Sequence, residues 1–94
     1  MTKENEIKKH HHAVMFFYRE SDLGISANPS KWVNTNIAYF NDGMQALECY
    51  ANTRCPASQL VSEETEEELK QAIEQMKKNY NDQQWLNDNL YPFL

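Results

Sequence analysis

The run AVMFFY, residues 13–18, decides which fold class this chain can adopt. It combines a β-branched residue with three consecutive aromatic residues, and it lies between a histidine triplet and the charged pair that follows it. A short apolar run bounded in this way is typical of a strand that is buried on both faces or lies centrally in a sheet. The rest of the chain must supply the neighbours of this strand.

A second strand is predicted at residues 32–40, WVNTNIAYF, where polar and apolar residues alternate around two asparagines. The segment between the strands, residues 19–31, contains Ser, Asp, Gly, Asn and Pro and is predicted to be a loop. Two strands alone form a marginally stable sheet. A third strand is therefore needed, and residues 22–27, residues 44–51 or another subunit could supply it.

Residues 44–51 have two interpretations. The Asn-Asp-Gly sequence before them could form a hairpin turn that leads into a strand. Alternatively, Asp42 caps a helix whose first residues are good helix formers. Met44, Leu47 and Ala51 would share one face of that helix. This spacing favours the helix.

The last third of the chain predicts two helices, near residues 63–80 and 83–90. Ser62 or Thr65 would start the first helix, and Thr65 with Glu68 matches a capping box. Acidic residues in its first turns and lysines near its end suit the helix dipole. Asp82 would cap the second helix. The first helix carries an apolar stripe on one face: Leu69, Ala72, Ile73, Met76 and Tyr80.

These elements indicate an α+β fold, a small antiparallel sheet with the C-terminal helices packed on one of its faces. The 94 residues are enough for one small core and leave no room for a cofactor domain with its own substrate domain. We expect a flexible polar arm at residues 1–11 and a single domain at residues 12–94.

The charge of the chain is concentrated at its C-terminal end. Residues 62–94 carry eight acidic and three basic side chains, and their net charge of −5 equals that of the whole chain. Such acidity argues against general affinity for nucleic acid, which requires clustered Lys and Arg, but it suits docking onto a basic protein surface. The bias toward Asn and Lys is typical of an A/T-rich coding genome, such as that of a phage or a low-GC bacterium.

The sequence also indicates a compartment. Cys49 and Cys55 are too few for the disulfide framework of small secreted domains. The first residues are charged and His-rich, unlike a signal peptide, and the longest apolar run has six residues, too short to span a bilayer. We expect a cytoplasmic protein that does not associate with membranes.

Candidate catalytic and metal-binding residues are few. His10 and His12 would lie on the same face of a strand and could share one ion, but a tight site needs further ligands. Free cysteines are usually small buried hydrophobic residues, and Cys55 precedes a proline at a predicted helix end, where a thiolate is disfavoured. The sequence contains no phosphate-binding glycine loop, serine-nucleophile or zinc-protease motif. We therefore expect no enzymatic activity, no cofactor and no metal, with the histidines exposed to solvent at the start of a strand.

The aromatic C-terminus and the acidic helix predict a protein-interaction module that inhibits a host or partner protein, such as a phage or mobile-element accessory protein. Its partner would have a basic surface or would be a second copy of this chain. The predicted partner-binding residues are Trp85, Leu86, Leu90, Tyr91, Phe93, Glu63, Glu67 and Glu74. The alternative is a nucleic-acid or nucleotide binder, which would use Lys8, Lys9, His10, His12, Tyr18 and Trp32.

Overall fold

The computed structural model describes residues 9–54 and 57–93 and confirms the α+β fold. Its three strands form one antiparallel sheet in the order β2-β1-β3. In chain order the elements are β1 (His11–Arg19), β2 (Trp32–Phe40), α2 (Gly43–Asn52), β3 (Ala57–Glu63), α3 (Glu66–Asn79), α4 (Gln83–Asn89) and the 3-10 turn η1 (Tyr91–Phe93). Both predicted strands, the helix favoured at residues 44–51 and both C-terminal helices are therefore present.

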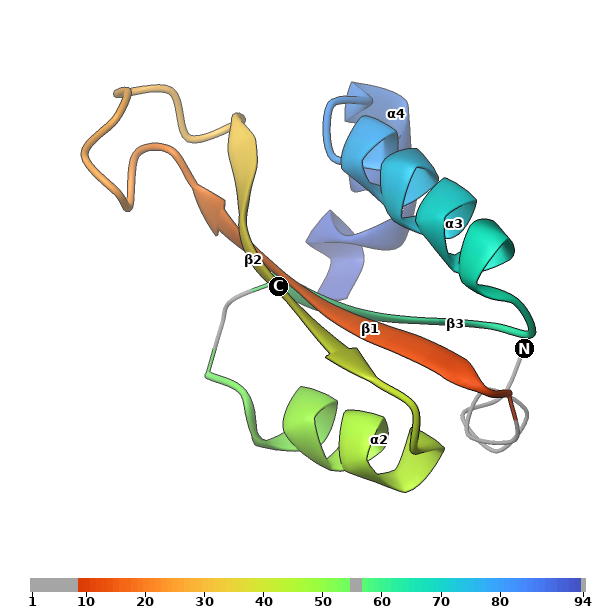
Figure 1. The fold of residues 1–94 in the computed structure, drawn as a ribbon. Helices are drawn as coiled ribbons and strands as arrows, with labels where there is room; N and C mark the ends of the chain where they lie inside the picture. The colour runs from red at the N-terminus through yellow and green to blue at the C-terminus, as the bar shows by residue number, and fades with distance from the viewer. Residues whose placement is uncertain (1–8, 55–56, 94) are drawn as a thin grey trace.

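Strand β1 is the central strand, as its apolar run predicts, and its alternating side chains serve two cores. Ala13, Met15 and Phe17 project into the larger core beneath α3 and α4. Val14 projects to the opposite face, where it packs with Ala46 of α2. Figure 1 shows α3 and α4 above the sheet and α2 below it. Helices thus cover both faces of the sheet, because the central strand is apolar on both sides.

The third strand is β3, which the sequence analysis did not identify. It pairs with β1 from His11 opposite Glu63 to Phe17 opposite Ala57. Ser62, a predicted start of the first C-terminal helix, lies within this strand instead. Because β3 is only seven residues long and half polar, its strand character comes from pairing with β1 more than from its own pattern.

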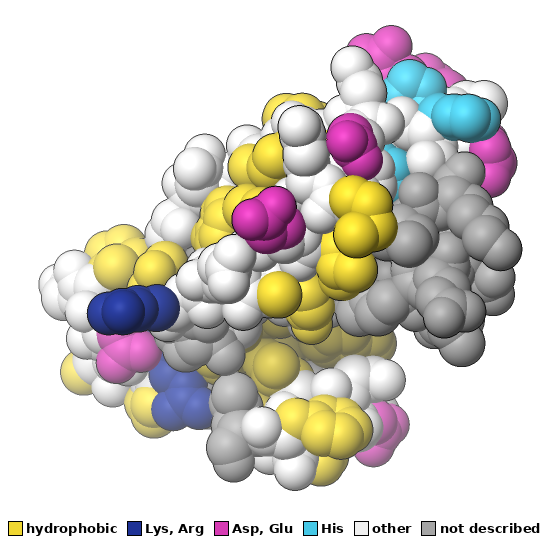
Figure 2. Space-filling model, turned by 90° about the horizontal axis from the view of Figure 1, so that it is seen from below, with side chains coloured by type: hydrophobic (Ala, Val, Ile, Leu, Met, Phe, Trp, Pro, Cys, Tyr) yellow, Lys and Arg dark blue, Asp and Glu magenta, His cyan; other side chains and the backbone are white. Residues whose placement is uncertain are grey.

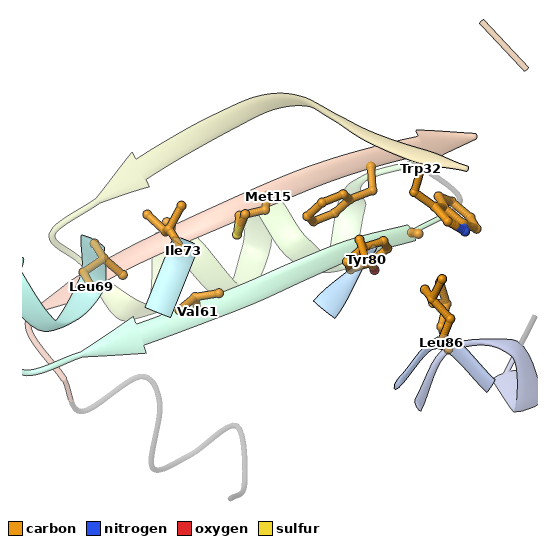
Figure 3. Close-up of a cluster of buried hydrophobic side chains, with 11 residues drawn as sticks. Met15, Trp32, Val61, Leu69, Ile73, Tyr80 and Leu86 are labelled. Carbon is orange, nitrogen blue, oxygen red and sulfur yellow. The ribbon is translucent and has the colours of Figure 1, made fainter. Parts of the chain in front are cut away.

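Helix α3 begins where the capping box predicts. The backbone N–H of Glu68 donates to Oγ1 of Thr65 at 3.1 Å, and that hydroxyl donates to the Glu68 carboxylate at 2.9 Å. Leu69 and Ile73 of the predicted stripe are buried against the sheet. Figure 3 shows both side chains over the sheet, with Ile73 between Leu69 and Met15. The stripe therefore fixes which face of α3 is internal.

An aromatic cluster ties the C-terminal end of the chain to the sheet. The ring of Tyr80, which follows α3, stacks on Phe17 with 3.6 Å between ring centroids and lies edge-on to Trp32 at 5.7 Å. Trp85 of α4 contacts the same ring at 5.3 Å. The hydroxyl of Tyr80 accepts a hydrogen bond from Nε2 of Gln59 in β3 at 2.9 Å. Tyr80 thus contacts all three strands of the sheet and helix α4.

Candidate functional site

The predicted partner-binding residues of the C-terminal segment divide into core residues and surface residues. Leu86 is 1% exposed and Leu90 is 7% exposed, and both belong to the core beneath α3 and α4. Their prediction as partner contacts is therefore wrong, because the domain itself covers them. Trp85 and Tyr91 are half-buried against the same core.

Phe93 is the residue of this set that the fold leaves in water. Its side chain is 82% exposed, the highest exposure among the large hydrophobic residues that the structure describes. The segment that carries it is nevertheless well anchored. The backbone N–H of Phe93 donates to the carbonyl of Leu90 at 3.0 Å. Two residues before it, the hydroxyl of Tyr91 accepts a hydrogen bond from Nε1 of Trp32 at 3.3 Å. The backbone that carries the exposed ring of Phe93 is therefore hydrogen-bonded to the end of α4, and the neighbouring Tyr91 is hydrogen-bonded to β2.

The three predicted carboxylates occupy different elements. Glu63 lies at the end of β3, where it is half-buried and forms an ion pair with Lys9 at 3.6 Å. Glu67 is exposed in the first turn of α3. Glu74 is exposed on the same helix and pairs with Lys77 at 3.5 Å. Only Glu67 and Glu74 therefore belong to an acidic outer surface of α3.

The residues of the alternative nucleic-acid site are not brought together on one surface. Lys8 lies outside the described residues. Lys9 donates to the carbonyl of Ser62 at 3.0 Å and pairs with Glu63, so its charge is used within the domain. His10 is exposed at the same end of β1.

Tyr18 and Trp32 lie near the opposite end of the β1–β2 ladder, where Arg19 is paired with Trp32. Tyr18 lies six positions after His12 in β1, which is about 20 Å at the usual rise of a strand. The indole of Trp32 is buried, with the guanidinium of Arg19 at 5.1 Å from its ring centroid. It therefore offers no open face on which a base could stack.

His12 is buried, which corrects the expectation that the histidines are exposed to solvent. Its Nε2 lies 2.8 Å from the carbonyl of Lys9, and its Nδ1 lies 2.7 Å from Oγ of Ser62. Since a carbonyl only accepts, Nε2 carries a proton and donates it to the carbonyl of Lys9. Both ring nitrogens are therefore occupied, and His12 joins the start of β1 to β3 instead of binding a metal with His10.

Within residues 9–54 and 57–93, no three His, Cys, Asp or Glu side chains are grouped so that they could hold a metal ion. Cys49 is a free, half-buried thiol that packs against the smaller core beside α2. Cys55 lies outside the described residues. In the described part of the chain, no helix is long and apolar enough to cross a bilayer.

A groove lies between α3 and the end of β2. This groove encloses about 400 Å³, and its lining includes His11, Tyr39, Glu66 and Lys70. Its volume is at the lower end of the range for ligand pockets. No sequence motif indicates it, because its walls come from three separate elements.

The surface on the α2 side of the molecule has no continuous basic area among its described residues. Figure 2 shows hydrophobic side chains there with a few acidic ones between them. On this face the visible Lys and Arg side chains lie toward the end that carries the loop between β1 and β2, and His side chains lie at the opposite end.

No known protein family, curated protein or solved structure matches this chain.

Proposed function

We propose that this protein is a cytoplasmic, non-enzymatic interaction module that binds a partner protein through its C-terminal segment. The observation that carries the proposal is the exposed ring of Phe93 on an anchored backbone. An aromatic side chain with two rotatable torsions loses little entropy when it inserts into a pocket, and aromatic residues dominate binding hot spots. A ring whose backbone is already fixed also avoids the cost of ordering the chain on binding.

Acidic side chains near this segment define the chemistry of the partner. Asp82 and Asp88 lie at the start and near the end of α4, and both are exposed. Glu67 and Glu74 extend the acidic surface along α3. The partner would therefore present an apolar pocket with Lys or Arg around it. The ring would supply most of the affinity, and the carboxylates would steer the encounter and make it sensitive to salt.

The proposal is tested by affinity capture from cell lysate with the full chain as bait, at low and high salt and after nuclease treatment. Phe93→Ala should lose most of the captured partner without changing the urea midpoint. Ile25→Ala is the matched control, because Ile25 is also a large exposed side chain, at 64%, and lies in the loop between β1 and β2.

The controls also separate the two classes of partner. If nuclease treatment removes the captured material, the chain binds nucleic acid. If Phe93→Ala and Ile25→Ala retain the same partner equally well, the C-terminal segment is not the interface.

A further inference from the structure

The two outer strands of the sheet differ in how their free edges are protected. Natural proteins protect such edges with charges, prolines, bulges or covering segments, because an open edge pairs readily with another strand. At the end of β3, Glu63 provides a charge, and Lys9 is held against the strand. Strand β2 contains no Asp, Glu, Lys, Arg, His or Pro, and among the described residues it pairs with β1 alone. Its edge is therefore the less protected one.

Neither α3 and α4 on one face of the sheet nor α2 on the other lies mainly over the free edge of β2. Helix α3 packs on β3 and β1, and α2 contacts β2 less than it contacts β1 and β3. Tyr39 is 64% exposed in consequence, beside the groove next to α3. A further strand could therefore lie beside β2 with both layers in place.

A bulge limits which part of β2 can pair. On β1, Phe16 faces Asn36 and Phe17 faces Asn34, so Thr35 is the extra residue. The regular run is Asn36–Phe40. Within it, Ile37 and Tyr39 project toward the α3 side, because they face Met15 and Ala13 of the core below α3. The residues between them project toward the α2 side.

We propose that two copies of this chain form a dimer by antiparallel pairing of residues 36–40 of β2, which joins their sheets into one of six strands. The dyad passes through Ala38, which faces Ala38 of the second copy. Tyr39 of each copy then lies opposite Ile37 of the other, and Asn36 lies opposite Phe40. This register alone pairs all five regular residues. A slip of one residue would set side chains of the α3 side against those of the α2 side, and a slip of two would bring the bulge into the ladder or leave its ends unpaired.

The composition of this run favours a second copy over a different protein. Tyr39 of each copy faces Ile37 of the other copy, so this contact between an aromatic and a β-branched side chain forms twice. The small side chain of Ala38 permits close approach at the dyad. The run is uncharged, so the net charge of −5 is not concentrated at the contact. Five paired residues span only about 17 Å, which implies a weak dimer with a dissociation constant in the micromolar range.

The register predicts a charge-exchange experiment by analytical ultracentrifugation. The wild-type chain should dimerise with increasing concentration. Ala38→Lys alone and Ala38→Glu alone should each weaken association at least about tenfold, because like charges would face each other at the dyad. An equimolar mixture of the two variants should recover the dimer. Thr35→Lys is the matched control, since it places the same charge on the bulge outside the ladder.

A crosslink tests the same register if either charged variant fails to fold. In a chain with Cys49→Ser and Cys55→Ser, Ala38→Cys should form a disulfide between copies, because facing residues of antiparallel strands have Cα atoms about 4.5–5.5 Å apart. Thr35→Cys should not crosslink, since the two Thr35 positions would be about 20 Å apart along the strands. A wild-type chain that stays monomeric up to about 1 mM, a charge-exchange mixture that stays monomeric, or equal crosslinking of both cysteine variants would overturn the proposal.

The dimer is independent of the proposed C-terminal interface, and the two can fail separately. Phe93→Ala should leave the dimer unchanged. If Phe93→Ala abolishes self-association, the dimer forms through the C-terminus and the β2 pairing is wrong.

Discussion

Replacing Tyr80 should reveal how strongly the C-terminal elements are held to the sheet. Tyr80 is almost fully buried, stacks on Phe17 and contacts Trp32 and Trp85. A buried aromatic side chain removes about 150–250 Å² from water, worth about 4–6 kcal/mol at about 25 cal/mol per Å². An alanine at this position would still bury part of this area, so Tyr80→Ala should lower the free energy of unfolding by about 3–5 kcal/mol.

The conservative variant separates the ring from its hydroxyl. Tyr80→Phe keeps the stacking and removes the hydrogen bond from Gln59, which should cost about 1 kcal/mol. A domain of this length has a total stability of about 5–14 kcal/mol. Tyr80→Phe should therefore fold normally, whereas Tyr80→Ala should lose a substantial part of the stability of the domain.

Urea denaturation followed by circular dichroism measures both variants. At a slope of about 1–3 kcal/mol per molar urea, the midpoint should fall by about 0.3–1 M for Tyr80→Phe and by about 1–5 M for Tyr80→Ala. Tyr39→Ala is the matched control, because it removes the same side chain from an exposed site. Its midpoint should change little at chain concentrations too low for dimerisation. Equal midpoints for Tyr80→Ala and Tyr39→Ala would show that the aromatic cluster does not hold the C-terminal elements to the sheet.

Three further predictions concern single interactions and use the same urea assay. His12→Ala should lower the free energy of unfolding by about 2–3 kcal/mol, because it removes a buried ring and leaves the Ser62 hydroxyl without its partner. A loss below about 0.5 kcal/mol would show that the contact between His12 and Ser62 does not stabilise the fold. Thr65→Ala should cost about 1 kcal/mol through loss of the cap of α3, and an unchanged midpoint would show that this cap does not stabilise the helix. Leu90→Ala should cost about 2–4 kcal/mol, whereas Phe93→Ala should leave the midpoint unchanged; similar losses would mean that Phe93 is also a core residue in solution.

The elements that the sequence predicted correctly are those whose signals are local. The run at residues 13–18 has too many large apolar side chains for a surface strand, and the stripe of α3 repeats at a helical period beneath a capping threonine. At residues 44–51 the cap supplied by Asp42 decides between helix and strand, and its carboxylate accepts from the N–H of Met44 at 2.9 Å. In each case neighbours in the sequence determine the structure.

The features that the sequence did not predict depend on contacts between distant segments. Strand β3 contains only a few apolar residues, and the residues of β1 that pair with it lie 40 to 52 positions earlier in the chain. The burial of His12 follows from the same pairing, because Ser62 is its partner across the ladder. Without β3, a histidine beside two others has no reason to be buried.

The candidate site was predicted only in part for a related reason. Aromatic and aliphatic residues near the C-terminus suit a core and an interface equally well, and composition cannot distinguish Leu86 from Phe93. Burial separates them, since the turn after α4 directs Leu90 inward and leaves Phe93 outside.

The position of β1 between β2 and β3 has a consequence for synthesis on the ribosome. The central strand emerges first, and about 44 residues lie between its end and the end of β3. At about 5–20 residues per second, the nascent chain carries AVMFFY for roughly 2–9 s before its second neighbour exists. During that interval β2 is the one strand that can pair with it, and neither α3 nor α4 yet covers its apolar face. Slower translation of residues 20–63 lengthens this exposure, so aggregation during synthesis should increase when that segment is translated slowly.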